Sequence, residues 1–96
     1  MNEKFEFTLP VGYLDKDGTL YKKGAMRLAT ASDEIIPLKS PQAQKDPEHL
    51  RRLILARVIL NFDPYLTSDI GIIEKLPQED IDFLEELYTK INSISD

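Results

Sequence analysis

The 96-residue sequence predicts one α+β domain, in which an N-terminal β-hairpin or small antiparallel sheet packs on two to three C-terminal helices. Three observations predict this fold class. Residues 1–36 are β-rich, residues 37–47 form a Pro-rich connector, and residues 48–93 have apolar side chains at helical spacing. A chain of this length forms one domain at most, so we expect the β-rich and helical parts to share a single core.

A β-hairpin is predicted near the N-terminus. Apolar residues at 13–14 and 20–21 flank the sequence Asp-Lys-Asp-Gly-Thr at 15–19, where Gly18 favours a left-handed turn residue. The returning strand is expected to continue through residues 26–28.

The first strand is predicted at residues 5–9, where apolar and polar side chains alternate. Pro10 either ends this strand or marks it as an edge strand, because proline has no N–H to donate. In the returning strand, Gly24 indicates a possible bulge.

Residues 30–37 predict one short helical turn, with Thr30 or Ser32 as its cap and the acids at 33–34 in its first turn. The following residues, 37–47, contain three prolines and several polar side chains. They are interpreted as a connector or a loop.

A central helix is predicted to begin after Asp46, because a capping side chain, Pro47 and Glu48 follow one another. Apolar residues then extend over 50–62 on more than one helical face, which predicts a helix covered on most sides. Pro64 is expected to follow its end.

The segment 65–76 is ambiguous between a short helix and a strand, since its isoleucines suit either and Gly71 weakens both. The last helix is expected to begin at Pro77, with acids in its first turn. Its apolar face consists of Ile81, Leu84, Leu87, Tyr88 and Ile91.

Composition and charge exclude several classes of function. The chain has no cysteine, which excludes thiolate metal sites and a Cys nucleophile and favours a reducing compartment. The net charge of −5 lies entirely in residues 74–96, because residues 1–73 have ten acids and ten bases. An acidic C-terminal helix repels phosphates, so we expect no nucleic-acid partner. Without a signal peptide or an apolar run of membrane-spanning length, we also expect no membrane partner and a cytoplasmic location.

The sequence Asp15-x-Asp17-Gly18-Thr19 matches the motif of the haloacid dehalogenase phosphatases, in which the first Asp is the nucleophile and the second is the general acid. That chemistry needs a buried parallel strand before the nucleophile and an α/β sheet that supplies further Mg²⁺ ligands. The residues before Asp15 are interrupted by Pro10 and Gly12, and the rest of the chain predicts no parallel sheet. A phosphohydrolase therefore stays only a remote alternative.

Other residues with chemical potential have simpler interpretations. His49 is the only histidine and has no nucleophile or carboxylate at a recognisable spacing. Asp33 and Glu34 suit a helix N-terminus. Arg51 and Arg52 are only a weak indication of phosphate binding, because their neighbours are acidic. We therefore predict no catalytic residue, no cofactor and no metal site.

The chain resembles a family of small tail-assembly proteins of contractile-tailed phages and of phage-tail-like particles encoded on bacterial chromosomes. The resemblance covers residues 5–92 and consists of helix, strand and turn landmarks rather than a catalytic motif. These landmarks are Gly12-Tyr13, Asp15 with Gly18, Met26-Arg27-Leu28-Ala29-Thr30, Asp33-Glu34, and Leu84, Leu87, Tyr88, Ile91 and Asn92.

The resemblance implies a protein that is not an enzyme and that binds another tail component. Some relatives are described as chaperones that keep the tape-measure protein soluble until the tube polymerises around it; the alternative is a minor structural subunit of the tail or baseplate. The residues expected to bind the partner are Asp17 and Gly18 at the hairpin tip and the acids Glu79, Asp82 and Glu86 on the last helix.

Overall fold

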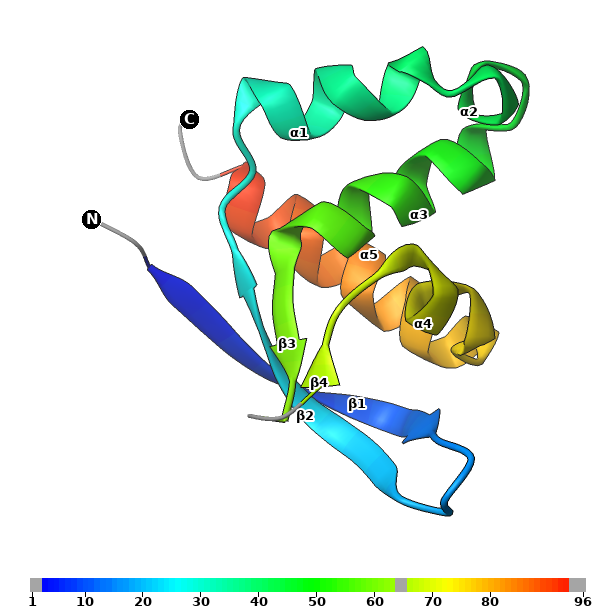
Figure 1. The fold of residues 1–96 in the computed structure, drawn as a ribbon. Coiled ribbons are helices and arrows are strands. Elements are labelled where there is room, and N and C mark those ends of the chain that lie inside the picture. Colours follow the sequence, from blue (N-terminus) through cyan, green and yellow to red (C-terminus); the bar gives the residue numbers. More distant parts are fainter. Residues whose placement is uncertain (1–2, 64–65, 94–96) are drawn as a thin grey trace.

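A computed structural model describes residues 3–63 and 66–93 of the chain. Its architecture is α+β: a four-stranded antiparallel sheet with helices (Figure 1). The strands lie in the order β1 (Lys4–Leu14), β2 (Leu20–Arg27), β3 (Ile59–Phe62) and β4 (Leu66–Thr67). The helices are α1 (Ala31–Ile35), the 3₁₀ helix η1 (Ile36–Lys39), α2 (Pro41–Lys45), α3 (Pro47–Val58), α4 (Ile70–Lys75) and α5 (Gln78–Asn92).

The predicted hairpin is confirmed as β1 and β2, and it is longer than expected. β1 continues through Pro10, which the sheet tolerates because β1 is an edge strand and needs no N–H donor on its free side. In the turn, Gly18 has a φ of 85°, the left-handed conformation that the sequence predicted. The distal part of this hairpin projects away from the helices (Figure 1).

The expected bulge does not fall on Gly24. Gly24 pairs regularly with Phe7 on one side and with Phe62 on the other. The register shifts instead between Ala25 and Met26, next to β3, and between residues 8 and 13 of β1. A Cβ atom at Gly24 would lie 2.6 Å from the Phe7 ring, so the glycine is there for a close approach and not for a bulge.

The interpretation of residues 37–47 as a connector or loop is wrong, because η1 and α2 lie there. Two of the three prolines that suggested an irregular segment, Pro37 and Pro41, occupy first-turn positions of these short helices, where no N–H is needed, and Pro47 begins α3. Ser40 caps α2 by accepting a hydrogen bond from the Ala43 N–H at 3.3 Å. α1, η1 and α2 run over α3, which returns beneath them (Figure 1).

The central helix begins as predicted, with the Asp46 side chain accepting from the Glu48 N–H and Pro47 in the first turn. Its predicted extension to residue 62 is wrong, since α3 ends at Val58 and β3 takes the next four residues. The residues of β3 face the core only at Ile59 and Phe62. Residues 59–62 form a strand because they pair with β2. The sequence did not indicate this, since an apolar run alone does not distinguish a helix from a buried strand.

The ambiguous segment contains both kinds of element. β4 pairs with β3, and α4 follows, capped by Asp69, whose carboxylate accepts from the Ile72 N–H at 2.9 Å. The cap is therefore one residue beyond Ser68 and two beyond Thr67, the caps considered from the sequence. Residues 64–65 lie outside the described residues, and this includes Pro64, which was expected to follow the central helix.

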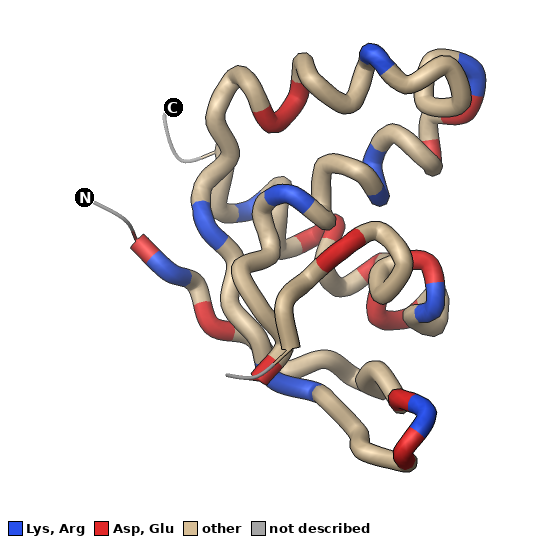
Figure 2. The backbone as a smooth tube through the Cα atoms, in the orientation of Figure 1, with Lys and Arg blue, Asp and Glu red and all other residues tan. Residues whose placement is uncertain are grey.

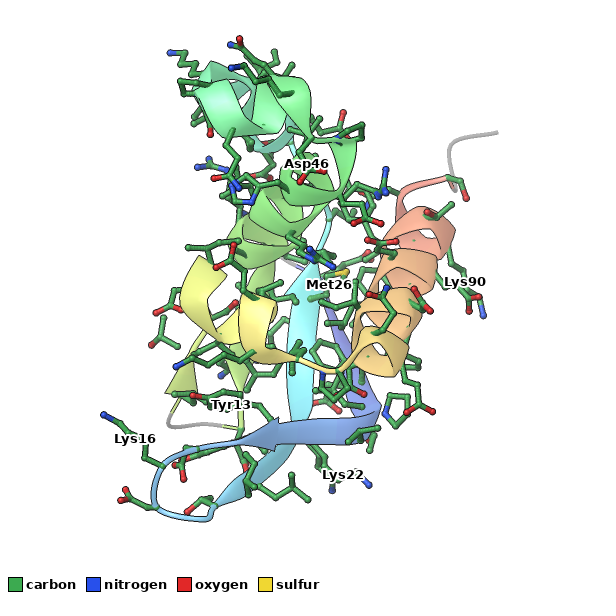
Figure 3. The ribbon with its side chains drawn as sticks, turned by 90° about the vertical axis from the view of Figure 1, so that its right-hand side faces the viewer. Tyr13, Lys16, Lys22, Met26, Asp46 and Lys90 are labelled. Atoms are coloured by element: carbon green, nitrogen blue, oxygen red, sulfur yellow. The ribbon has the colours of Figure 1, made fainter. Side chains whose placement is uncertain are left out.

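The last helix, α5, is confirmed and follows Pro77 directly. Ile81, Leu84 and Ile91 are buried, and Leu87 and Tyr88 are half-buried against them. In the view of Figure 3, α4 and α5 lie on either side of β2, with the fully buried Met26 between them. One core cluster contains residues from β1, β2, β3, α3, α4 and α5, so the strands and helices share their interior as predicted.

Candidate functional site

The carboxylate of Asp15 shapes the hairpin turn. It accepts hydrogen bonds from the N–H groups of Asp17 and Thr19, both at 2.9 Å. The strand before it, β1, pairs antiparallel with β2 and lies at the sheet edge. Asp15 is therefore engaged in a turn, and the buried parallel strand that the dehalogenase chemistry requires does not precede it.

The predicted contact residues Asp17 and Gly18 are exposed at the tip of the projecting hairpin. Charges of both signs alternate there (Figure 2). Behind the tip, Leu14 and Leu20 face each other across the hairpin and are 63% and 49% exposed. The tip is thus a polar turn with an exposed apolar pair at its base.

The other predicted contact residues, Glu79, Asp82 and Glu86, are exposed on α5. They recur at three- and four-residue spacing and so follow one stripe of the helix. The hairpin tip and this acidic stripe are on different elements and form two separate surfaces.

Asp80, on the buried side of α5, links this helix to the hairpin. Its carboxylate is fully buried and accepts hydrogen bonds from the N–H groups of Val11 at 2.9 Å and Gly12 at 2.7 Å. β1 is an edge strand, and among the described strands it pairs only with β2. The Asp80 carboxylate therefore provides acceptors for two N–H groups of this strand. In the sequence, Asp80 was interpreted only as one of the acids of the C-terminal quarter that complement the dipole in the first turn of the last helix. Its one distinguishing feature was its place in the first turn between Pro77 and the buried Ile81.

A small pocket lies between α3 and α5, the two long helices. Its volume is about 150 Å³ and its lining is mostly apolar. Ile54 and Leu55 of α3 face Tyr88 of α5 across it, and Arg51 approaches Glu85 to 3.5 Å. Thr89 and Glu85 also line a shallower hollow on the outer face of α5, together with Asp82, Glu86 and Lys90.

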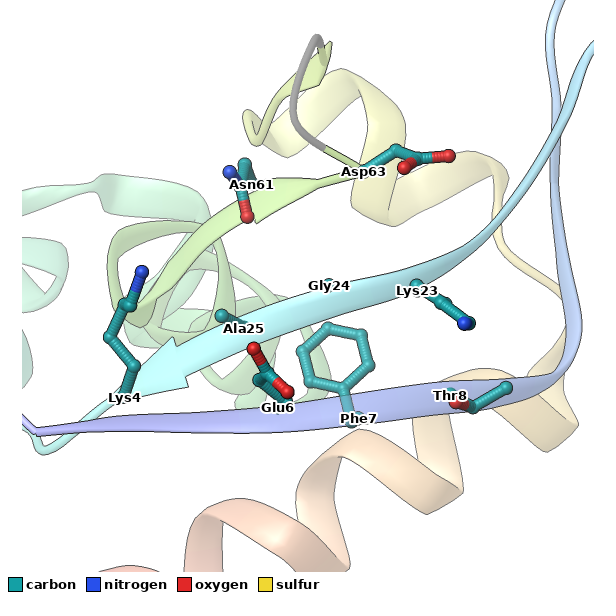
Figure 4. Close-up of a pocket in the computed structure, with 9 residues that line it drawn as sticks. All are labelled: Lys4, Glu6, Phe7, Thr8, Lys23, Gly24, Ala25, Asn61 and Asp63. Atoms are coloured by element: carbon teal, nitrogen blue, oxygen red, sulfur yellow. The ribbon is translucent and has the colours of Figure 1, made fainter.

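A larger and more polar hollow of about 540 Å³ lies over the strands β1, β2 and β3 (Figure 4). Its floor includes Gly24 and the Phe7 ring. Four charged residues surround it, two of each sign. They are Lys4, Glu6, Lys23 and Asp63. Asp63 has a φ of 59°, which is uncommon for a residue other than glycine.

Asp33 is the second buried carboxylate of the fold. It forms ion pairs with Arg27 at 2.7 Å and with Arg57 at 3.0 Å, and it also accepts from Thr30 as the capping box of α1. Hydrogen bonding from Arg27 lowers the pKa of Asp33 well below its usual range, against the opposing effect of burial. The network joins β2, α1 and α3. Its geometry is that of a structural ion pair.

Glu34 and Tyr88 link α1 to α5. The Tyr88 hydroxyl donates to the Glu34 carboxylate, and burial followed by this bond raises the pKa of Tyr88 above its usual range. A second bond to α5 comes from the segment between β2 and α1, where the Ala29 N–H donates to Asn92 Oδ1 at 2.9 Å. The landmark segments of the resemblance at 26–30, 33–34 and 84–92 therefore meet in space.

His49 lies at the start of α3 with its Nδ1 3.6 Å from a Glu74 carboxylate oxygen. This carboxylate comes from α4, 25 positions along the chain, so no local spacing could have indicated it. Over residues 3–63 and 66–93, no group of three or more His, Cys, Asp or Glu residues is placed to hold a metal ion. Within the same ranges, no helix has the length and apolar character needed to cross a bilayer.

Comparisons with protein-family models, with curated proteins and with solved structures find no match to this chain.

Proposed function

We propose that the protein is a non-enzymatic assembly protein of phage tails or phage-tail-like particles. It acts in the bacterial or infected-cell cytoplasm by binding another tail component, such as the tape measure or a tube or baseplate protein. The chaperone or accessory role is the form of this proposal that the resemblance favours.

One observation carries the proposal. The segments that resemble tail-assembly proteins contact one another: Arg27 pairs with Asp33, and Tyr88 donates to Glu34. Glu34 and Tyr88 are 54 positions apart in the sequence, so their contact depends on the fold being formed. The landmarks of the resemblance therefore lie together in one packed part of this chain, which supports interpreting them as one set and not as separate helix patterns.

The surface chemistry supports a binding role. The acids of α5 are exposed, and large apolar side chains are exposed both on the hairpin and on the α1–η1 segment. The latter include Ile35, which is 57% exposed. Exposed apolar side chains that gather into a patch are typical of interaction surfaces.

The test is co-expression with the tape-measure, tube and baseplate proteins of the same gene cluster, each in turn, followed by purification through a tag on this chain. We expect one of them to co-purify at a fixed ratio, and the tag alone to capture none. Failure to bind any of these proteins would contradict the proposal. A Mg²⁺-dependent phosphatase activity that Asp15→Asn abolishes would contradict its non-enzymatic part.

A second candidate, a minor structural subunit, is favoured by the projecting hairpin. Leu14 and Leu20 are a cross-strand pair of large apolar residues that the chain itself leaves exposed, as a permanent subunit contact would require. Mass spectrometry of purified particles distinguishes the two. A chaperone is absent from mature tails, whereas a subunit remains in them.

A further inference from the structure

We propose that the groove between α3 and α5 binds an amphipathic helix of the partner, with one apolar side chain in the pocket and a row of Lys or Arg along the acidic stripe of α5. The groove is defined as the pocket lined by Arg51, Ile54, Leu55, Glu85, Tyr88 and Thr89, together with the adjoining outer face of α5 at Asp82 and Glu86. The inference rests on the proposed function in that the partner is a tail component. It adds which surface binds and what chemistry it binds.

The pocket has the size and polarity of a site for one apolar side chain. An apolar cavity of about 150 Å³ accepts a benzene ring, so this pocket can accept a Leu or Phe side chain. Ile54 is half-buried here, and its remaining exposed surface would be covered by such a side chain.

The acidic wall fixes the charge of the occupant. The charged residues that line this surface are three acids, Asp82, Glu85 and Glu86, and two bases, Arg51 and Lys90. The surface is therefore net acidic. Arg51 is already within 3.5 Å of Glu85, which leaves Asp82 and Glu86 as the exposed acids.

The spacing of the acids favours a helix as the occupant. Asp82 and Glu86 are four residues apart, which is about 6 Å along the helix axis, and Glu79 extends the stripe by another turn. A second helix lying alongside α5 presents residues at the same repeat, so basic residues at i, i+4 and i+7 would each meet one acid. A polar or acidic helix would leave the pocket empty or repel the stripe.

The test uses two designed helical peptides, measured by fluorescence anisotropy. The first has leucine on one face and lysine beside it, and the second has glutamate in place of each lysine. We expect the lysine peptide to bind the full chain and the glutamate peptide to bind at least about tenfold more weakly, with affinity falling as salt is raised. Two-dimensional NMR should place the shifted amides at residues 51–55 and 82–89.

Charge reversal provides a matched control. Asp82→Lys with Glu86→Lys should weaken lysine-peptide binding by about tenfold or more and allow the glutamate peptide to bind. Glu3→Lys with Glu6→Lys changes the net charge equally on the N-terminal strand and should change neither affinity. Thr89→Trp, which fills the rim of the pocket at an exposed position, should weaken binding, and Thr8→Trp on the sheet should not.

Each outcome decides a separate question. If the tail component binds wild type and the groove variants equally, the groove inference is wrong and the proposed function stands. If the lysine peptide binds the groove but no tail protein does, the proposed function is wrong and the groove stands. Absence of peptide binding overturns the groove. So does a dimer that is lost in Thr89→Trp, because a second copy would then occupy it.

Discussion

Two buried carboxylates join the elements of this fold at the residue scale, and they do so differently. Asp33 is neutralised by two arginines and sits where β2, α1 and α3 meet. The described donors to Asp80 are two backbone N–H groups of β1, and neither carries a charge. In the sequence, Asp33 was recognisable as a helix-start residue, but the partners of both carboxylates are fixed by tertiary contacts that no local spacing encodes.

Asp80→Ala is expected to lower the free energy of unfolding by about 3 kcal/mol, because it leaves the N–H groups of Val11 and Gly12 without an acceptor. Asp80→Asn keeps one acceptor oxygen and should cost less. The measurement is urea denaturation followed by circular dichroism. Asp82→Ala removes the same group from an exposed position of α5 and should cost under about 0.5 kcal/mol. Equal costs at the two positions would contradict the role assigned to Asp80.

Asp33 should make stability depend on acid pH. Its pKa is lowered in the folded state, so at low pH the unfolded state binds more protons at this group than the folded state does. The stability it contributes is present above the ordinary Asp pKa of about 4 and is lost as the pH falls below that value. Urea denaturation from pH 7 downward should show a steeper loss below about pH 4 for wild type than for Asp33→Asn. Asp82→Asn should keep the wild-type slope.

At the element scale, start signals in the sequence were more informative than end signals. Asp46 with Pro47 located the beginning of α3, and Pro77 located α5. The end of α3 was missed because residues 59–62 continue the apolar run, and only pairing with β2 makes them a strand. Pro37 and Pro41 were taken as breakers because the sequence does not say that each lies in the first turn of a new short helix.

Two glycines of the hairpin should differ in their tolerance of alanine. Gly18 has a φ of 85°, and no atom of the described residues lies within 4 Å of the position that a Cβ would take there. Gly18→Ala should therefore cost only backbone strain, about 1 kcal/mol. At Gly12, with a φ of 109°, a Cβ would lie 3.0 Å from the Tyr21 carbonyl oxygen and 2.8 Å from Lys22 Cγ. Gly12→Ala should therefore cost about 3 kcal/mol.

Urea denaturation of both variants checks this order. The aromatic pair Tyr13 and Tyr21, with ring centroids 6.1 Å apart, provides a fluorescence probe close to Gly12. A Gly18→Ala variant less stable than Gly12→Ala would mean that the turn, and not the bulged middle of the hairpin, limits its stability.

At the scale of the whole molecule, the α+β class, the shared core and the antiparallel hairpin were predictable from residue patterning, whereas the two further strands of the sheet were not. β3 comes from the apolar run that was assigned to the central helix, and β4 comes from the segment 65–76 that was ambiguous between a helix and a strand. Neither is long enough to show a strand pattern of its own, since β3 has four residues and β4 has two. The surfaces proposed for binding divide in the same way. The acids of α5 were visible in the sequence, but the pocket between α3 and α5 depends on how the helices pack.

Because β2 pairs with β3 and α5 packs on β1, the sheet cannot form without the C-terminal half, so unfolding should be a single cooperative transition. Tyrosine fluorescence and circular dichroism should report coincident urea midpoints for the full chain. Fragments 1–36 and 37–96 should each lack a cooperative transition, since each exposes core residues such as Phe7 and Leu84 that are buried against the other half. Mixing the fragments should restore part of the transition. A cooperative transition in either fragment alone would mean that the two halves are separate folding units, and the links through Asp80, Tyr88 and Asn92 would then be docking contacts between them.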